Sequence, residues 1–96
     1  SASASPRSQL SAERMLLDEA RAALVQGNPT VALDRLQRHR RTFASPVLGE
    51  ERDAMEVEAL ARAGRVPEAQ ARADAFRRHY PRSLFLPTVE SAATNP

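Results

Sequence analysis

Histidine is the side chain of this sequence best suited to metal binding or proton exchange, and the chain has two, His39 and His79. They stand 40 residues apart, and neither has a second ligand four residues away in a metal-like pattern. The chain also lacks cysteine. The spacing therefore favours histidines that pack or stay at the surface, and we expect no metal or other cofactor.

Carboxylates could serve in acid–base catalysis, but here they stand four positions from arginines, the spacing of ion pairs on a helix surface. The serines have no nucleophile motif around them, and the three glycines are too scattered for a phosphate-binding loop. We therefore expect the chain not to be an enzyme. The four pairs at this spacing are Asp34 with Arg38, Glu58 with Arg62, Glu68 with Arg72, and Asp74 with Arg78.

Arginine supplies all fourteen cationic side chains, and two clusters, RHRR at 38–41 and RRH at 77–79, could bind phosphate groups. Both clusters fall in the expected last turns of helices, where cations complement the helix dipole. The net charge is only +2, and no aromatic residues alternate with the arginines as a base-stacking surface needs. The sequence therefore disfavours nucleic acid as a partner.

Composition and periodicity together indicate an all-α fold. Eighteen residues are alanine and only 4% are aromatic, a mix suited to closely packed helices. Apolar residues recur at helical spacing over about 11–26, 29–43, 46–63 and 67–80, and a short helix is expected at 83–92. We expect one helical domain over 11–90, preceded by a flexible linker at 1–10 and ending in a disordered tail at 91–96.

The helix ends are marked by specific residues. Asn28–Pro29 and Ser45–Pro46 each combine a capping side chain with a proline in the first turn. Gly27 and Gly64 each follow a periodic segment and can adopt the left-handed backbone that ends a helix.

The chain aligns with itself when it is shifted by 37 residues. This match predicts two copies of a helical hairpin, each with a glycine in its turn and an alanine that lets the two helices approach closely. The pairs include Glu13 with Glu50, Glu19 with Glu56, Ala22 with Ala59, Gly27 with Gly64, Ala32 with Ala69, Arg35 with Arg72, and Phe43 with Tyr80.

In these residues the chain resembles the tetratricopeptide repeats, whose pattern is matched by Gly64, Ala69, Phe76 and Pro81. The first copy matches with Gly27, Ala32 and Leu36, but its proline is displaced and His39 stands where a small residue is usual. The resemblance implies two antiparallel hairpins, at about 11–45 and 46–82, with a capping helix at 83–92, as a right-handed α-solenoid fragment. The lengthened repeat is similar to repeats of bacterial cell-envelope proteins of the outer-membrane assembly-factor type.

Glu19 and Glu56 depart from the family pattern, because they occupy a position where the family has leucine. Buried carboxylates are costly unless they are paired. We therefore expect each to pair with an arginine of its own hairpin's second helix, which is Arg35 or Arg40 in the first copy and Arg72 or Arg77 in the second.

The resemblance implies a partner-binding concave face formed by the first helix of each hairpin, and the mixed charges on it favour a protein segment or peptide bearing a few charges. The expected lining is Arg14, Leu17, Arg21, Leu24, Glu51, Ala54, Glu58 and Arg62. The alternative is a structural spacer or a self-associating domain, because arrays of this kind usually need about three repeats. Dimerisation would then use the apolar triplet Leu84, Phe85 and Leu86.

The sequence does not fix the location of the protein. No run approaches the roughly 20 apolar residues of a membrane span, and no signal peptide is apparent. The first residue is serine and not methionine, so we expect the chain to be an excised domain or a processed product, and the resemblance implies that the larger protein is bacterial. The resemblance favours the periplasmic side of the cell envelope over the cytoplasm.

Overall fold

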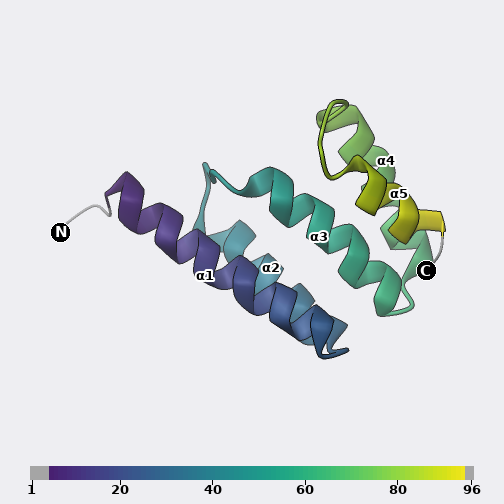
Figure 1. Ribbon diagram of the computed structural model, residues 1–96, viewed down its shortest axis with the longest axis horizontal. Coiled ribbons are helices and arrows are strands. Elements are labelled where there is room, and N and C mark those ends of the chain that lie inside the picture. The colour runs from purple at the N-terminus through teal and green to yellow at the C-terminus, as the bar shows by residue number, and fades with distance from the viewer. Residues whose placement is uncertain (1–4, 95–96) are drawn as a thin grey trace.

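The computed structural model of the 96-residue chain describes residues 5–94, which form five helices and no strand. The expected all-α fold is confirmed. Figure 1 shows α1, α3 and α5 across one side of the molecule, with α2 behind α1 and α4 behind α5. The helices are α1 (Pro6–Val25), α2 (Pro29–Thr42), α3 (Gly49–Arg62), α4 (Val66–His79) and α5 (Leu86–Thr94).

The first helix begins earlier than expected, at Pro6 rather than near Ser11. The Ser5 side chain accepts a hydrogen bond from the Ser8 backbone N–H at 3.1 Å, and Pro6 occupies the first turn, where it loses no bond. Residues 6–10 are therefore helical, and the expectation of a flexible linker there is wrong. Residues 1–4 of that expected linker lie outside the described part of the chain.

The two turns at Gly27 and Gly64 have the same geometry. Both glycines adopt a left-handed backbone, with φ of 77° and 79°, as the sequence predicted. In the first turn, the N–H of Asn28 donates to the Ala23 carbonyl at 2.8 Å, which closes a Schellman cap. The Gly27 N–H donates to the Leu24 carbonyl at 3.1 Å in the same turn. The second turn repeats both bonds: the Arg65 N–H donates to the Leu60 carbonyl at 2.9 Å, and the Gly64 N–H donates to the Ala61 carbonyl at 3.1 Å.

The third helix begins at Gly49, and the expected start at Ser45–Pro46 is wrong. Leu48 precedes the helix and gives it no side-chain cap. The free backbone N–H groups of Val47 and Leu48 instead donate to the Glu13 carboxylate, at 3.0 and 2.9 Å. A buried side chain of α1 therefore fixes the entry to α3, and local capping signals do not.

The core lies on both sides of α3, which contacts every other helix. One cluster of apolar side chains joins α1, α2 and α3, with contributions also from α4, and a second joins α3, α4 and α5. Residues 54–61 of α3 are consequently all buried. The central residues of the clusters include Leu17, Leu24, Leu36 and Met55 in the first, and Val57, Phe76 and Val89 in the second.

The last helix, α5, packs against α3 and α4. It begins at Leu86, which is 37 positions after Gly49, rather than at Ser83 as expected. Pro87 lies in its first turn, where proline is tolerated. The helix continues to Thr94, so residues 91–94 are helical and the expectation of disorder from residue 91 is wrong there. The remaining two residues of that tail lie outside the described range.

Candidate functional site

Two ion pairs join α1 to α3 on the first-helix face, which we define as the side formed by α1, α3 and α5. Both guanidinium groups bind their carboxylates through two nitrogens: Arg14 binds Glu51 at 2.8 and 2.9 Å, and Arg21 binds Glu58 at 3.2 Å twice. Each pair joins positions 37 residues apart, so equivalent positions of the two copies face each other. The hydrogen bond from Arg14 lowers the pKa of Glu51 despite its partial burial.

The expected lining of this face is only partly correct. Leu17, Leu24 and Ala54 are buried in the core, so their assignment to an exposed surface is wrong. Arg62 is exposed, and its Nη1 donates to the Leu24 carbonyl at 3.1 Å. The sequence placed these residues on one face but could not show which side of α1 turns inward.

A pocket of about 410 Å³ opens between α3 and α5, and we call it the α3–α5 pocket. Thr88 stands in the repeat position of Glu51, and among residues 5–94 no ion pair joins α3 to α5 in the way that Arg14 and Glu51 join α1 to α3. Arg62 reaches this pocket and has no carboxylate within ion-pair distance among residues 5–94. The pocket is lined by Glu58, Ala61, Arg62, Pro87, Thr88, Ser91 and Ala92.

A buried polar network, which the sequence did not predict, lies between α1, α2 and α3. Glu13 and His39 are fully buried, and Arg52 is nearly so. The Arg52 guanidinium can only donate, so His39 Nδ1 accepts from it at 3.3 Å and His39 Nε2 donates to Glu13 at 2.9 Å. This arrangement requires the neutral imidazole with its proton on Nε2.

Glu13 is a charged group held in the interior by four donors. Burial disfavours its charge, but hydrogen bonds from Gln9, the Val47 and Leu48 backbone N–H groups, and His39 lower the pKa of Glu13 to about 2. Its repeat equivalent is Glu50, and repeat symmetry gave no signal that only the first copy has this role.

The network continues to the opposite face through Asp53. Arg52 and Arg40 both donate to its Oδ1, at 3.1 and 3.0 Å, and the Tyr80 hydroxyl donates to Oδ2 at 3.1 Å. Burial, followed by the charge of Asp53, raises the pKa of Tyr80. Arg40 also contacts Glu56, with both oxygens at 3.4 Å from Nη2.

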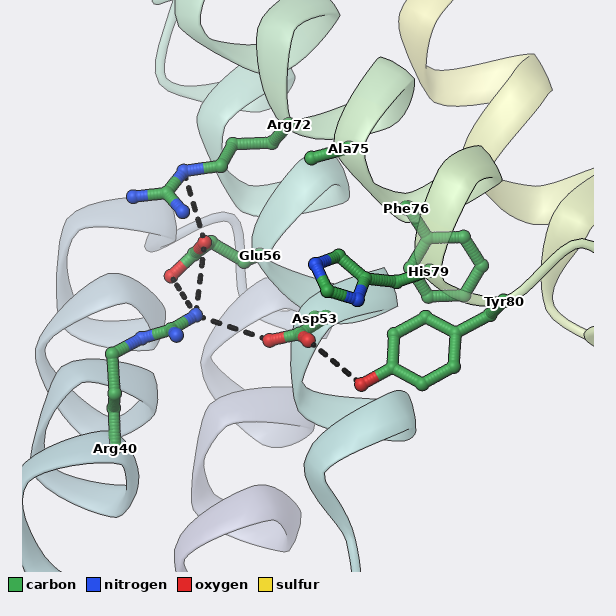
Figure 2. Close-up of a pocket in the computed structure, with 8 residues that line it drawn as sticks. All are labelled: Arg40, Asp53, Glu56, Arg72, Ala75, Phe76, His79 and Tyr80. Carbon is green, nitrogen blue, oxygen red and sulfur yellow. Dashed lines mark hydrogen bonds and ion pairs between the residues drawn. The ribbon is translucent and has the colours of Figure 1, made fainter. Parts of the chain in front are cut away.

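A second pocket, of about 150 Å³, opens where this network reaches the surface between α2, α3 and α4 (Figure 2). We call it the Arg40–Arg72 pocket after the two arginines on its rim. Figure 2 shows Arg40 extending from α2 and Arg72 from α4 toward Glu56, with the His79 ring beside them. Its lining residues are Arg40, Asp53, Glu56, Arg72, Ala75, Phe76, His79 and Tyr80.

The expected carboxylate pairings hold in part. Glu19 pairs with Arg35 at 3.0 Å, but Glu19 is exposed rather than buried. Glu56 is buried and meets Arg72 at 3.4 Å, as expected, but it also meets Arg40 of the other copy. The sequence predicted a partner from the same hairpin for each carboxylate, whereas in the structure Glu56 lies between an arginine of each hairpin.

Most of the pairs expected at four-residue spacing are replaced by other partners. Asp34 and Arg38 lie 3.8 Å apart and are confirmed. The other three expected pairs do not form, because each carboxylate pairs with a different arginine. Glu58 pairs with Arg21, Glu68 with Arg65, and Asp74 with Arg77.

The apolar triplet at 84–86 does not form one exposed patch. Leu84 is 94% exposed, whereas Phe85 and Leu86 are partly buried against the second core cluster. Leu84 and Phe85 also precede α5 instead of lying on it.

His39 is a packing histidine and His79 is a surface one. Within the described residues, no three His, Asp or Glu side chains are grouped so that they could hold a metal ion. None of the helices described is both long and apolar enough to cross a membrane.

Comparisons with protein-family models, with curated proteins and with solved structures give no match for this chain.

Proposed function

We propose that the chain is a non-enzymatic interaction module that binds a segment of a partner protein on its first-helix face, with the α3–α5 pocket as the point of contact. The observation that carries this proposal is the pocket itself together with Arg62. Between α1 and α3 the corresponding space is spanned by Arg–Glu pairs, whereas between α3 and α5 it is open.

The chemistry of the pocket favours an acidic side chain in the partner. Arg62 is anchored through one nitrogen to the Leu24 carbonyl, which leaves its other N–H groups for a carboxylate. The hydroxyl groups of Thr88 and Ser91 offer further hydrogen bonds, and Ala61 and Ala92 offer an apolar wall. The segment that fits is therefore an acidic residue flanked by small apolar ones.

A peptide array tests this proposal. Peptides of about ten residues, in acidic, neutral and basic sets, are presented to the protein, and we expect retention of acidic members. Arg62→Gln keeps a donor for the Leu24 carbonyl but removes the charge, so we expect about tenfold weaker binding. Arg41→Gln, which changes an exposed arginine at the end of α2, is the control and leaves binding unchanged. Equal retention of all three sets, or binding that survives Arg62→Gln, would contradict the proposal.

A further inference from the structure

The Arg40–Arg72 pocket lies on the α2–α4 side of the molecule, and its polar groups have unused hydrogen-bonding capacity. Arg40 makes its contacts through Nη2 alone, and Arg72 reaches Glu56 through Nε alone. A guanidinium group carries five N–H donors, so several on each arginine have no partner among the described residues. The side chains of Arg40 and Arg72 are 42% and 55% exposed.

The carboxylate between these arginines is held loosely. All three of the Glu56 contacts measure 3.4 Å, whereas charge-assisted N–H···O bonds are normally about 2.7–2.9 Å. The equivalent pair of the first copy, Glu19 with Arg35, measures 3.0 Å. Glu56 is shared between two cations, and it saturates neither of them.

The charged side chains that line the pocket are equal in number, with Arg40 and Arg72 against Asp53 and Glu56, so an anion would be held by the unused N–H donors and not by an excess of positive charge. The His79 imidazole lines the same pocket, is exposed, and makes a ring contact with Tyr80 but no hydrogen bond within residues 5–94. It provides another nitrogen that can donate to an anion.

Space is available because the repeat position that holds Arg38 in the first copy holds Ala75 in the second. The resulting volume of about 150 Å³ suits a single small group and is too small for a whole peptide segment. We propose that the Arg40–Arg72 pocket binds a phosphate group, held by the outer N–H groups of Arg40 and Arg72 and by His79.

Phosphate is favoured over a carboxylate for two reasons. Donors reach the pocket from α2 and from two positions of α4, which matches the several oxygens of a phosphate better than the two of a carboxylate. A phosphate also carries about −1.5 to −2 charges, so each hydrogen bond that it accepts from a guanidinium N–H is stronger than that of a carboxylate, while its repulsion from Glu56 increases as well. The group is either free phosphate or a phosphoserine of a peptide. This inference is independent of the α3–α5 pocket.

The test is an NMR titration of the full chain at constant ionic strength, with inorganic phosphate as the probe. We expect saturable shifts of the His79 ring and of the Arg40 and Arg72 side-chain signals, and about tenfold weaker binding of acetate. Arg72→Gln should weaken phosphate binding about tenfold. Arg65→Gln is the control, because Arg65 lies just before the N-terminus of α4, does not line the pocket, and pairs with Glu68.

A serine peptide and its phosphorylated form separate the two sources. Binding of both inorganic phosphate and the phosphopeptide supports a site for the group itself, and binding of the phosphopeptide alone supports recognition on a peptide. The proposal is overturned if neither binds saturably, if acetate binds as well as phosphate, or if Arg72→Gln behaves like Arg65→Gln. Circular dichroism of each variant verifies that the helices are retained.

Discussion

At the scale of single residues, Glu13 determines how the chain enters α3, since its carboxylate binds two backbone N–H groups of the connection. The hydrogen bonds around it overcome the cost of burial because they number four, with one donor on α1, one on α2 and two in the connection between α2 and α3. A charge that is fully hydrogen-bonded in the folded state and free in the unfolded state makes stability depend on pH.

We predict that Glu13 stabilises the fold at neutral pH and ceases to do so in acid. Its pKa falls from 4.5 to about 2 on folding, so its contribution is complete above about pH 4.5 and is lost as the pH falls toward 2. The shift corresponds to about 3 kcal/mol. Thermal unfolding of the wild type and of Glu13→Gln between pH 7 and pH 2 measures it.

Other carboxylates, among them Glu51 and Glu90, also have lowered pKa values and titrate in the same range. The informative quantity is therefore the difference in stability between the wild type and Glu13→Gln, and this difference should shrink toward pH 2. A difference that stays constant with pH would contradict the prediction.

His39 leads to a second prediction at this scale, because its repeat equivalent is Phe76. In the second copy, Phe76 packs in an apolar cluster with Val89, which stands in the position of Arg52. His39→Phe would remove one buried hydrogen-bond partner from each of Glu13 and Arg52, and we expect a loss of about 2–4 kcal/mol in the free energy of unfolding. Urea unfolding at pH 7 measures the loss, and stability equal to that of the wild type would refute it.

At the scale of helices and turns, the two glycine turns followed from the sequence because a left-handed backbone is a local requirement that few residues other than glycine meet. The starts of α1 and α3 did not. Ser45–Pro46 has the residues of a helix start, but the buried Glu13 binds the backbone of Val47 and Leu48, and the chain stays non-helical until Gly49. That competition involves residues more than 30 positions apart, which no local signal reports.

A third prediction concerns these turns. A Cβ built on Gly27 or Gly64 would meet no atom within 4 Å, so replacement by alanine costs only the strain of the left-handed backbone. We expect Gly64→Ala to lower the free energy of unfolding by about 1–2 kcal/mol, and Gly27→Ala to lower it equally. Gly64→Asn is the control, since asparagine tolerates this conformation, and it should lose less. Chemical denaturation distinguishes the three, and unequal losses at the two glycines would show that the turns are not equivalent.

At the scale of the whole molecule, the sequence could predict which charged residues lie on the first-helix face but not how they pair with one another. Charged residues at positions 14, 21, 51 and 58 were placed on that face, and the structure brings them together in two pairs. Their mutual pairing depends on equivalent positions of the two copies stacking in register, a property of the assembled helices. The Arg40–Arg72 pocket was missed for the same reason, because three helices contribute to it.

The last prediction tests this stacking. α1 packs mainly on α2 and approaches α3 less closely, so the pair of Arg14 with Glu51 is a principal link between them. A double-mutant cycle with Arg14→Gln and Glu51→Gln should give a coupling of about 0.5–1 kcal/mol, because the pair is partly exposed and binds through two nitrogens. The coupling should decrease in about 1 M salt, where charges are screened within roughly 3 Å.

The matched control is the exposed pair of Arg65 with Glu68, which lies at the start of α4 and joins no two helices. Its coupling should be smaller than that of Arg14 with Glu51, because both of its groups are solvated. Arg14 also lies 3.5 Å from Asp18, but both arms of the cycle that remove Arg14 remove that contact, so it cancels. A coupling no larger than in the control would mean that this ion pair does not help to hold α1 against α3, and that the core packing sets the register of the first-helix face.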